Sequence, residues 1–190
     1  MEPIYEIRRL YDVMPASARM SVKIISKPEL SKVVDATYPL PGRQEKPIYI
    51  NFDFWNRLQE GERDLLLLRT VCLITAVKWL KPDIYQGAVI AGLLGTLVEL
   101  AQSDAVGVVV ALGLTVTAAM RVWRINTSQE AELNADSNAI QVALRRGYTE
   151  TSAAQYLLDA IQQVAKLEKR PTLDFIELIR SQNLLKLLNL

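Results

Sequence analysis

Histidine is absent from the 190 residues of this chain, and cysteine occurs only once. Histidine is the commonest general base and metal ligand in proteins, so its absence excludes the usual nucleophile–histidine sites and most zinc sites. The single cysteine, Cys72, lies in an apolar run, which favours a small core residue in a reducing compartment. We therefore expect no cofactor, no bound metal and no enzymatic activity.

An excess of either charge is also lacking. The chain has 22 Lys and Arg against 21 Asp and Glu, a net charge of +1, and no basic tail. Without a positive field, nucleic acid is not an expected partner. The sequence contains no glycine-rich phosphate loop, and its N-terminus is too charged for a signal peptide.

What the chain does have is two long apolar runs, Ile84–Ala101 and 105–123, separated only by the polar residues 102–104. As a helix, each run would span roughly 27 Å, close to the roughly 30 Å core of a bilayer. The short break predicts an antiparallel helical hairpin over residues 83–124. Basic residues flank both outer ends, which favours a transmembrane hairpin with both termini on the cytoplasmic side. A helix pair buried in a larger assembly is the alternative.

Small residues recur at every fourth position in both arms of this hairpin. Such spacing gives each helix a smooth face on which the two backbones can approach closely. The residues predicted to form this packing face are Gly87, Ala91 and Gly95 in the first arm and Gly107, Ala111, Thr115 and Ala119 in the second.

The sequence on both sides of the hairpin, residues 1–82 and 125–190, predicts two parts of one mostly helical domain with at most a small sheet. Residues 48–52 are the best strand candidate, and Val33 with Val34 is the only other plausible partner. The proline-rich segment 27–47 predicts an extended connector. Helices are expected at Pro3–Val13, 16–26, 62–80, 130–146, 151–169 and 173–188, with Thr127 and Glu130 as a capping box for the fourth.

A motif beyond the hairpin carries a family resemblance. Glu132, Ala135 and Asp136 form a Glu-x-x-Ala-Asp element at the start of a helix, followed by an aliphatic face, a Gly-Tyr pair and an alanine-rich helix. This order resembles the membrane-bound zinc peptidases of the HtpX and CAAX-protease family. In that family the glutamate is the third zinc ligand, which corresponds to Glu132, and the element follows a His-Glu-x-x-His helix, commonly with membrane helices between the two.

The corresponding helix here, 62–80, lacks that motif. Arg69, Thr70 and Leu73 stand where the first histidine, the glutamate and the second histidine would be. The resemblance, over roughly residues 47–165, therefore implies a metallopeptidase-like helical domain whose metal site has degenerated. We expect Arg69 to form a buried ion pair with Glu132 or Asp136 in place of the metal.

The chain as a whole, from MEPIYEIRRLYDVMPASARM through KPDIYQG to ELIRSQNL, also resembles a family of uncharacterised cyanobacterial proteins. That resemblance implies a photosynthetic cell. It also implies that the hairpin lies in the lipid bilayer of a thylakoid membrane.

Together these features predict a non-catalytic, membrane-anchored interaction protein that holds a polypeptide while a photosynthetic membrane complex is assembled or repaired. Photosystem II is the favoured partner. The alternatives are a structural accessory subunit of a large complex and an enzyme of unidentified type.

Overall fold

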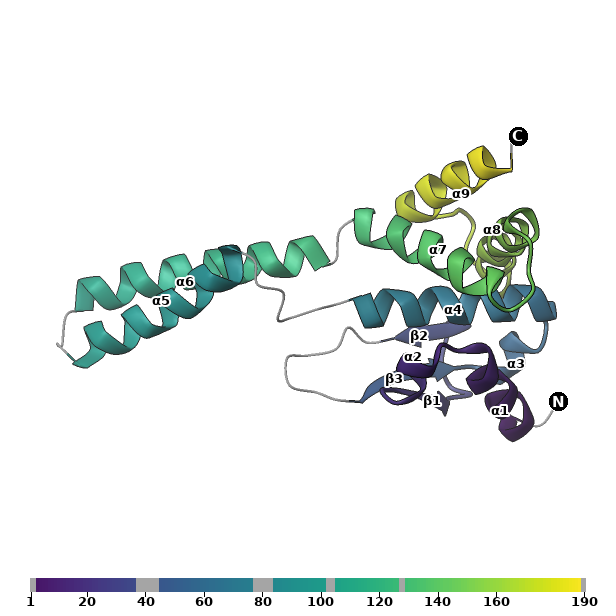
Figure 1. The fold of residues 1–190 in the computed structure, drawn as a ribbon, viewed down its shortest axis with the longest axis horizontal. Coiled ribbons are helices and arrows are strands. Elements are labelled where there is room, and N and C mark those ends of the chain that lie inside the picture. The colour runs from purple at the N-terminus through teal and green to yellow at the C-terminus, as the bar shows by residue number, and fades with distance from the viewer. Residues whose placement is uncertain (1–2, 37–44, 77–83, 102–104, 127–128, 189–190) are drawn as a thin grey trace. The chain divides into compact units, whose positions relative to one another are not determined.

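The computed structural model describes residues 3–36, 45–76, 84–101, 105–126 and 129–188 (Figure 1). The chain divides into two units, Met1–Val77 with Glu132–Leu190, and Lys78–Ala131, which we call the globular unit and the hairpin unit. In chain order the elements are α1 (Pro3–Val13), α2 (Ala16–Arg19), β1 (Val22–Ser26), β2 (Val34–Ala36), β3 (Lys46–Ile50), α3 (Phe52–Trp55), α4 (Glu60–Ala76), α5 (Ile84–Ala101), α6 (Ala105–Asn126), α7 (Gln129–Leu144), α8 (Glu150–Leu167) and α9 (Phe175–Leu187).

Helix α4 is the central element of the globular unit. Its apolar residues occur on all sides, which is typical of a helix buried all round. Leu67 and Val71 pack in a first core with α1, the sheet and α3, whereas Leu65 and Leu68 pack in a second core with α7, α8 and α9. Accordingly, α4 lies between the sheet on one side and α7 and α8 on the other (Figure 1).

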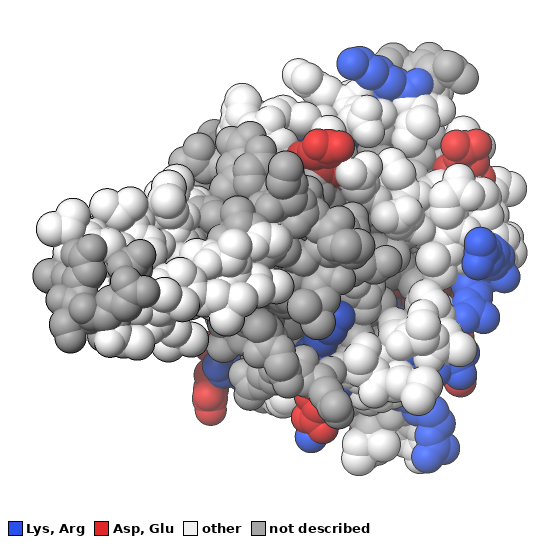
Figure 2. All heavy atoms as spheres, turned by 60° about the vertical axis from the view of Figure 1, so that its left-hand side comes forward, with Lys and Arg blue, Asp and Glu red and all other residues white. Residues whose placement is uncertain are grey.

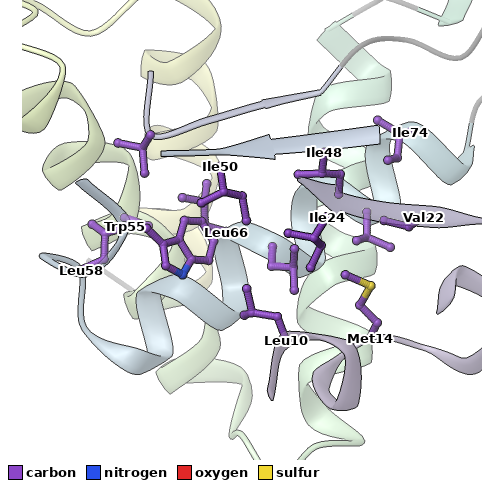
Figure 3. Close-up of a cluster of buried hydrophobic side chains, with 14 of the residues drawn as sticks. Leu10, Met14, Val22, Ile24, Ile48, Ile50, Trp55, Leu58, Leu66 and Ile74 are labelled. Atoms are coloured by element: carbon purple, nitrogen blue, oxygen red, sulfur yellow. The ribbon is translucent and has the colours of Figure 1, made fainter. Parts of the chain in front are cut away.

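The sheet has three strands in the order β1-β3-β2, with β1 parallel and β2 antiparallel to β3. Alternate residues of β1 and β3 are β-branched and buried, so one face of the sheet covers the first core. Figure 3 shows side chains of this core, among them Leu10, Met14, Val22, Ile24, Ile48, Ile50, Trp55, Leu58, Leu66 and Ile74.

The mostly helical fold with a small sheet is confirmed. The predicted helix over 16–26, however, ends at Arg19, because the β-branched residues from Val22 onward pair with β3 instead. The strand predicted over 48–52 runs over Lys46–Ile50, and Asn51 ends it by accepting a hydrogen bond from Asp53 N at 3.0 Å, which caps α3. Thr127, from the predicted capping box, lies outside the described residues.

The hairpin unit contains the two predicted helices, α5 and α6. Among the described residues, however, no helix combines the length and the apolar composition needed to cross a membrane. The predicted transmembrane hairpin is therefore wrong, and so is the two-helix thylakoid location with cytoplasmic termini.

Small residues form the seam between α5 and α6, but in α5 the seam lies one position away from the predicted one. A Cβ on Gly92 would lie 2.3 Å from Thr115 Oγ1, so the two helices approach closely there. Thr96 and Thr115 are buried, and each hydroxyl donates to the carbonyl four residues earlier. Buried threonine and close-packed glycine therefore define this interface.

The residues predicted to form the packing face distribute as follows. Gly107 and Ala111 are partly buried and Thr115 is buried, whereas Gly87 and Ala91 are exposed and a Cβ on Gly87 or Gly95 would meet nothing within 4 Å. The side chain of Ala119 and the turn at 102–104 lie outside the described residues. The large apolar residues of both arms point outward, and Leu97 is 63% exposed.

Candidate functional site

Four charged side chains from three helices of the globular unit contact one another, and we call them the ion cluster: Arg69 on α4, Glu132 and Asp136 on α7, and Arg180 on α9. Arg180 donates from Nε to Asp136 Oδ2 at 2.7 Å and from Nη2 to Oδ1 at 2.9 Å. Arg69 Nη2 contacts Glu132 Oε2, and Arg69 Nε lies 3.5 Å from Asp136 Oδ1. The cluster carries no net charge.

Helix geometry explains why these side chains meet. Glu132 and Asp136 are four residues apart and so lie on one face of α7. Leu184, which is fully buried, lies four residues after Arg180 and fixes the inner face of α9. All four side chains are at most 15% exposed. Because a buried charge is stable only with a partner, the cluster ties α4, α7 and α9 together.

Two adjoining cavities of about 330 Å³ each lie over the ion cluster and share Lys32, Val34, Arg69, Asp174, Glu177 and Arg180; we call them the β2 cleft. Strand β2, α4, α8 and the start of α9 line it. The floor of the first cavity is apolar, with Leu66, Leu157, Ala160, Ile161 and Val164, all at most 9% exposed. The cleft therefore combines a charged rim with an apolar floor.

Among the described residues, no strand pairs with the outer edge of β2, which lines this cleft. The Val33 carbonyl accepts from Asn51 N at 3.0 Å, and the register pairs Asp35 with Tyr49. Hydrogen-bonded and non-hydrogen-bonded positions alternate in an antiparallel ladder, so Val34 and Ala36 direct their backbone N–H and C=O away from β3.

The opposite edge of the sheet, on β1, is covered by a side chain. The hydroxyl of Tyr11, on α1, accepts from Ile24 N at 3.2 Å and lies 3.5 Å from the Val22 carbonyl, to which it donates. The protein thus caps one edge strand with its own side chain, as natural sheets commonly do. The edge strand on the other side, β2, lines the cleft with Val34, Asp35 and Ala36.

Further ion pairs fix the rim of the β2 cleft. Arg170 donates to both carboxylate oxygens of Glu177 at 2.6 and 2.7 Å, and to Glu168 at 2.9 Å. Burial disfavours the ionised Glu177, but its hydrogen bonds from Arg170 and from Asp174 N outweigh this and lower its pKa. Glu168 Oε1 also accepts from Val33 N at 2.9 Å, which holds the chain before β2 against the end of α8.

The structure brings all five residues of the predicted degenerate site together. Arg69, Thr70, Leu73 and Glu132 line the second cavity of the β2 cleft, and Asp136 lies behind them. The Thr70 hydroxyl donates within its own helix to the Leu66 carbonyl at 2.8 Å. Among the described residues, no three side chains of ligand type converge to form a metal site.

Sequence reasoning missed Arg180, the second cation of the cluster. The available signal was the one that singled out Arg69: a lone arginine within an amphipathic helix needs either a partner or a route to water. The i, i+4 spacing to buried Leu184 would have placed it on the inner face of α9.

A second buried network fastens α1 to α4. Glu6, only 1% exposed, accepts from Arg9, from Trp55 Nε1 at 3.2 Å and from Arg63 at 2.8 Å. Burial disfavours the ionised Glu6, but the bonds from Arg9 and Trp55 outweigh this and lower its pKa. Its polar groups bind one another, so we interpret this network as structural.

Acidic and basic side chains are interspersed on the face of the described residues shown in Figure 2. Within the core, burial raises the pKa of the Cys72 thiol to about 11, which keeps it protonated and unreactive at neutral pH.

Comparison with known proteins gives one family match. The profile of a family described as "Protein of unknown function (DUF3318)" matches residues 8–148, which include Arg69, Glu132 and Asp136 and end before α8. No curated protein and no solved structure gives a significant match to the chain. The thylakoid, photosystem and peptidase assignments made from the sequence therefore gain no support.

Proposed function

We propose that this chain, which belongs to the DUF3318 family, is a non-catalytic protein that binds an extended segment of another polypeptide. The observation that carries the proposal is the open edge of β2 along a cleft, in a sheet whose other edge is covered by Tyr11. An exposed strand edge presents unpaired backbone groups, which an added strand satisfies.

The binding mode would be strand addition. The outward N–H and C=O groups of Val34 and Ala36 offer the main-chain hydrogen bonds, and the cleft walls receive side chains of the added segment. Because β2 is only three residues long, few main-chain bonds can form. Selectivity must then come from the cavities beside the strand.

The ion cluster has a supporting role in this proposal. It joins α4, α7 and α9 beneath the cleft, so the walls are already in place before a ligand arrives, which lowers the entropic cost of binding. Arg69 places a fixed positive charge beside Glu132, where the resembling peptidases hold zinc. This arrangement, in a chain without histidine, supports binding without hydrolysis.

A substitution on the strand edge tests the proposal. Val34→Pro removes the outward N–H while leaving the positions that pair with β3, and proline is tolerated on edge strands. We expect it to weaken peptide binding about five- to tenfold, as measured by fluorescence anisotropy. Val34→Thr, which keeps the N–H, is the matched control. Equal binding by both variants and the wild type would exclude the β2 edge as the site.

Affinity purification of the full chain with cross-linking would identify the polypeptide. An assembly intermediate of photosystem II remains a prediction from the cyanobacterial resemblance, which this experiment tests. A partner whose cross-links map away from β2, α8 and α9 would contradict the proposed binding mode.

A second candidate, a structural subunit of a larger assembly, is favoured by the hairpin unit. Its outward residues are large and apolar, and a large exposed apolar surface is typical of an interface. They are Ile90, Leu93, Leu94, Leu97, Val98, Val106, Val109, Val110, Leu112, Leu114, Val116 and Met120, each at least 44% exposed. Constant stoichiometry with a mature complex would favour this candidate, and substoichiometric capture would favour the first.

A further inference from the structure

Resting on the proposed function, we infer that the β2 cleft selects an internal, uncharged segment with an aliphatic side chain. Arg180 binds a main-chain carbonyl of that segment, and the apolar floor of the first cavity binds the side chain.

Arg180 has one nitrogen left for a ligand. Its side chain is 93% buried, and Nε and Nη2 are both used by Asp136. Among the described residues, Nη1 has no hydrogen-bond or ion-pair partner, and it is not one of the nitrogens sealed from solvent. Arg180 lines both cavities, and Nη1 is the guanidinium nitrogen that the bonds to Asp136 leave available to a ligand there. A guanidinium this buried holds Nη1 in place, ready to donate to an acceptor.

The acceptor should be neutral. The lining of the two cavities contains four basic and five acidic side chains, and Arg180 is already neutralised by Asp136. A carboxylate in the cleft would therefore meet a slightly negative surface and gain no net attraction. A main-chain carbonyl accepts the same hydrogen bond without adding charge.

The floor of the first cavity fits an aliphatic side chain. Leu66, Leu157, Ala160, Ile161 and Val164 present only hydrocarbon there, and the cavity of about 330 Å³ is large enough for a leucine. Val34 lines both cavities, so the side-chain site and Arg180 lie beside the same residue of β2. Neighbouring residues of one added strand, about 3.3 Å apart, can occupy both.

Labelled heptapeptides of alternating threonine and valine, acetylated and amidated, provide the probe. In three of them the central residue is leucine, alanine or aspartate. A fourth, shorter peptide ends at the leucine, which then carries the free C-terminal carboxylate. On the full chain, by fluorescence anisotropy, we expect the leucine peptide to bind about tenfold more tightly than the alanine peptide. The aspartate peptide and the peptide with the free carboxylate should bind no better than the alanine peptide.

Two variants locate the two contacts. Val164→Phe fills the floor and should reduce the preference for leucine over alanine to less than twofold, whereas Gln163→Phe, on the exposed side of α8, should leave it unchanged. Arg180→Lys keeps the positive charge beside Asp136 but removes Nη1. It should weaken the binding of all the peptides about tenfold. The unfolding midpoint shows whether each variant is folded.

The outcomes separate this inference from the proposed function. If no peptide binds the wild type, the proposed function fails. If peptides bind with no preference for leucine, or if Val164→Phe leaves the preference intact, the floor assignment is overturned while strand addition stands. Tighter binding of the peptide with the free carboxylate would overturn the assignment of a neutral acceptor. Unchanged peptide binding by a folded Arg180→Lys variant would overturn the role of Nη1. Should Arg180→Lys not fold, the carboxylate comparison in the wild type decides.

Discussion

Buried charges are the clearest residue-scale feature of this protein, and each depends on its partners. Asp136 is 2% exposed and receives two hydrogen bonds from Arg180. Removing one member of such a pair leaves the other charge stranded, which costs more than the pair itself contributes.

Arg180→Met should therefore lower the free energy of unfolding by about 3–5 kcal/mol in urea titrations. Adding Asp136→Asn to this variant should recover part of the loss, because the stranded charge is then gone. Arg170→Met is the comparison and should cost less, because the Arg170 side chain is 30% exposed against 7% for Arg180, so water screens its ion pairs more strongly. If Arg180→Met lowers the free energy of unfolding no more than Arg170→Met does, Asp136 does not depend on Arg180 as a buried partner.

The pH dependence of stability should report on Glu6. Burial opposes its ionisation, but bonds from Arg9 and Trp55 lower its pKa below the ordinary value of 4.5. The stabilisation is therefore complete above pH 4.5 and is lost as the pH falls through the folded-state pKa, because the unfolded chain takes up its proton first. Glu6→Gln should flatten the fall of unfolding free energy below pH 4.5. A slope identical to that of the wild type would place the acid sensitivity elsewhere.

At the scale of elements, periodicity located most helices, and the misses have physical causes. Residues 22–26 lie in a segment with helical spacing, yet they pair with β3, which begins more than 20 residues later. Local propensity cannot report a parallel partner so distant in sequence. The sequence predicts strand β2 only as Val33 and Val34. Its place at a sheet edge could not be predicted, because it depends on the strand order β1-β3-β2, which is set by the tertiary fold.

The seam of the hairpin unit gives an element-scale prediction. Gly92→Ala should destabilise α5 and α6 by about 1–3 kcal/mol, because the added Cβ would clash with Thr115 Oγ1 at 2.3 Å. Gly95→Ala meets nothing within 4 Å and should instead stabilise α5 slightly through helix propensity. Ala91→Leu should be tolerated, since Ala91 is exposed. Hydrogen exchange of the α5 and α6 amides measures the stability of all three variants. Unchanged protection in Gly92→Ala would contradict the packing of Gly92 against Thr115.

At the scale of the whole molecule, the sequence located the helices of the hairpin but not their environment. Length and end charges favour a bilayer, whereas no helix among the described residues is both long and apolar enough to cross one. The candidate site was more accessible to prediction, because Glu132 and Asp136 share a helix face and Arg69 stands within an apolar run of the sequence, where a charge needs a partner. Arg180 and the β2 cleft required the tertiary packing of α8 and α9.

Zinc provides a test of the whole site. A cation would have to displace Arg69 from Glu132 and Arg180 from Asp136, and it would gain only carboxylate ligands in return. Equimolar and tenfold excess zinc should therefore leave the unfolding temperature of the wild type unchanged, since a ligand stabilises only in proportion to its binding to the folded state. The double variant Arg69→His, Leu73→His places two histidines one helical turn apart, facing the cleft beside Glu132, and should gain stability with zinc. A zinc-dependent rise in the unfolding temperature of the wild type would show that the ion cluster opens for a metal, and would contradict the proposal that its ion pairs hold the walls of the cleft in place.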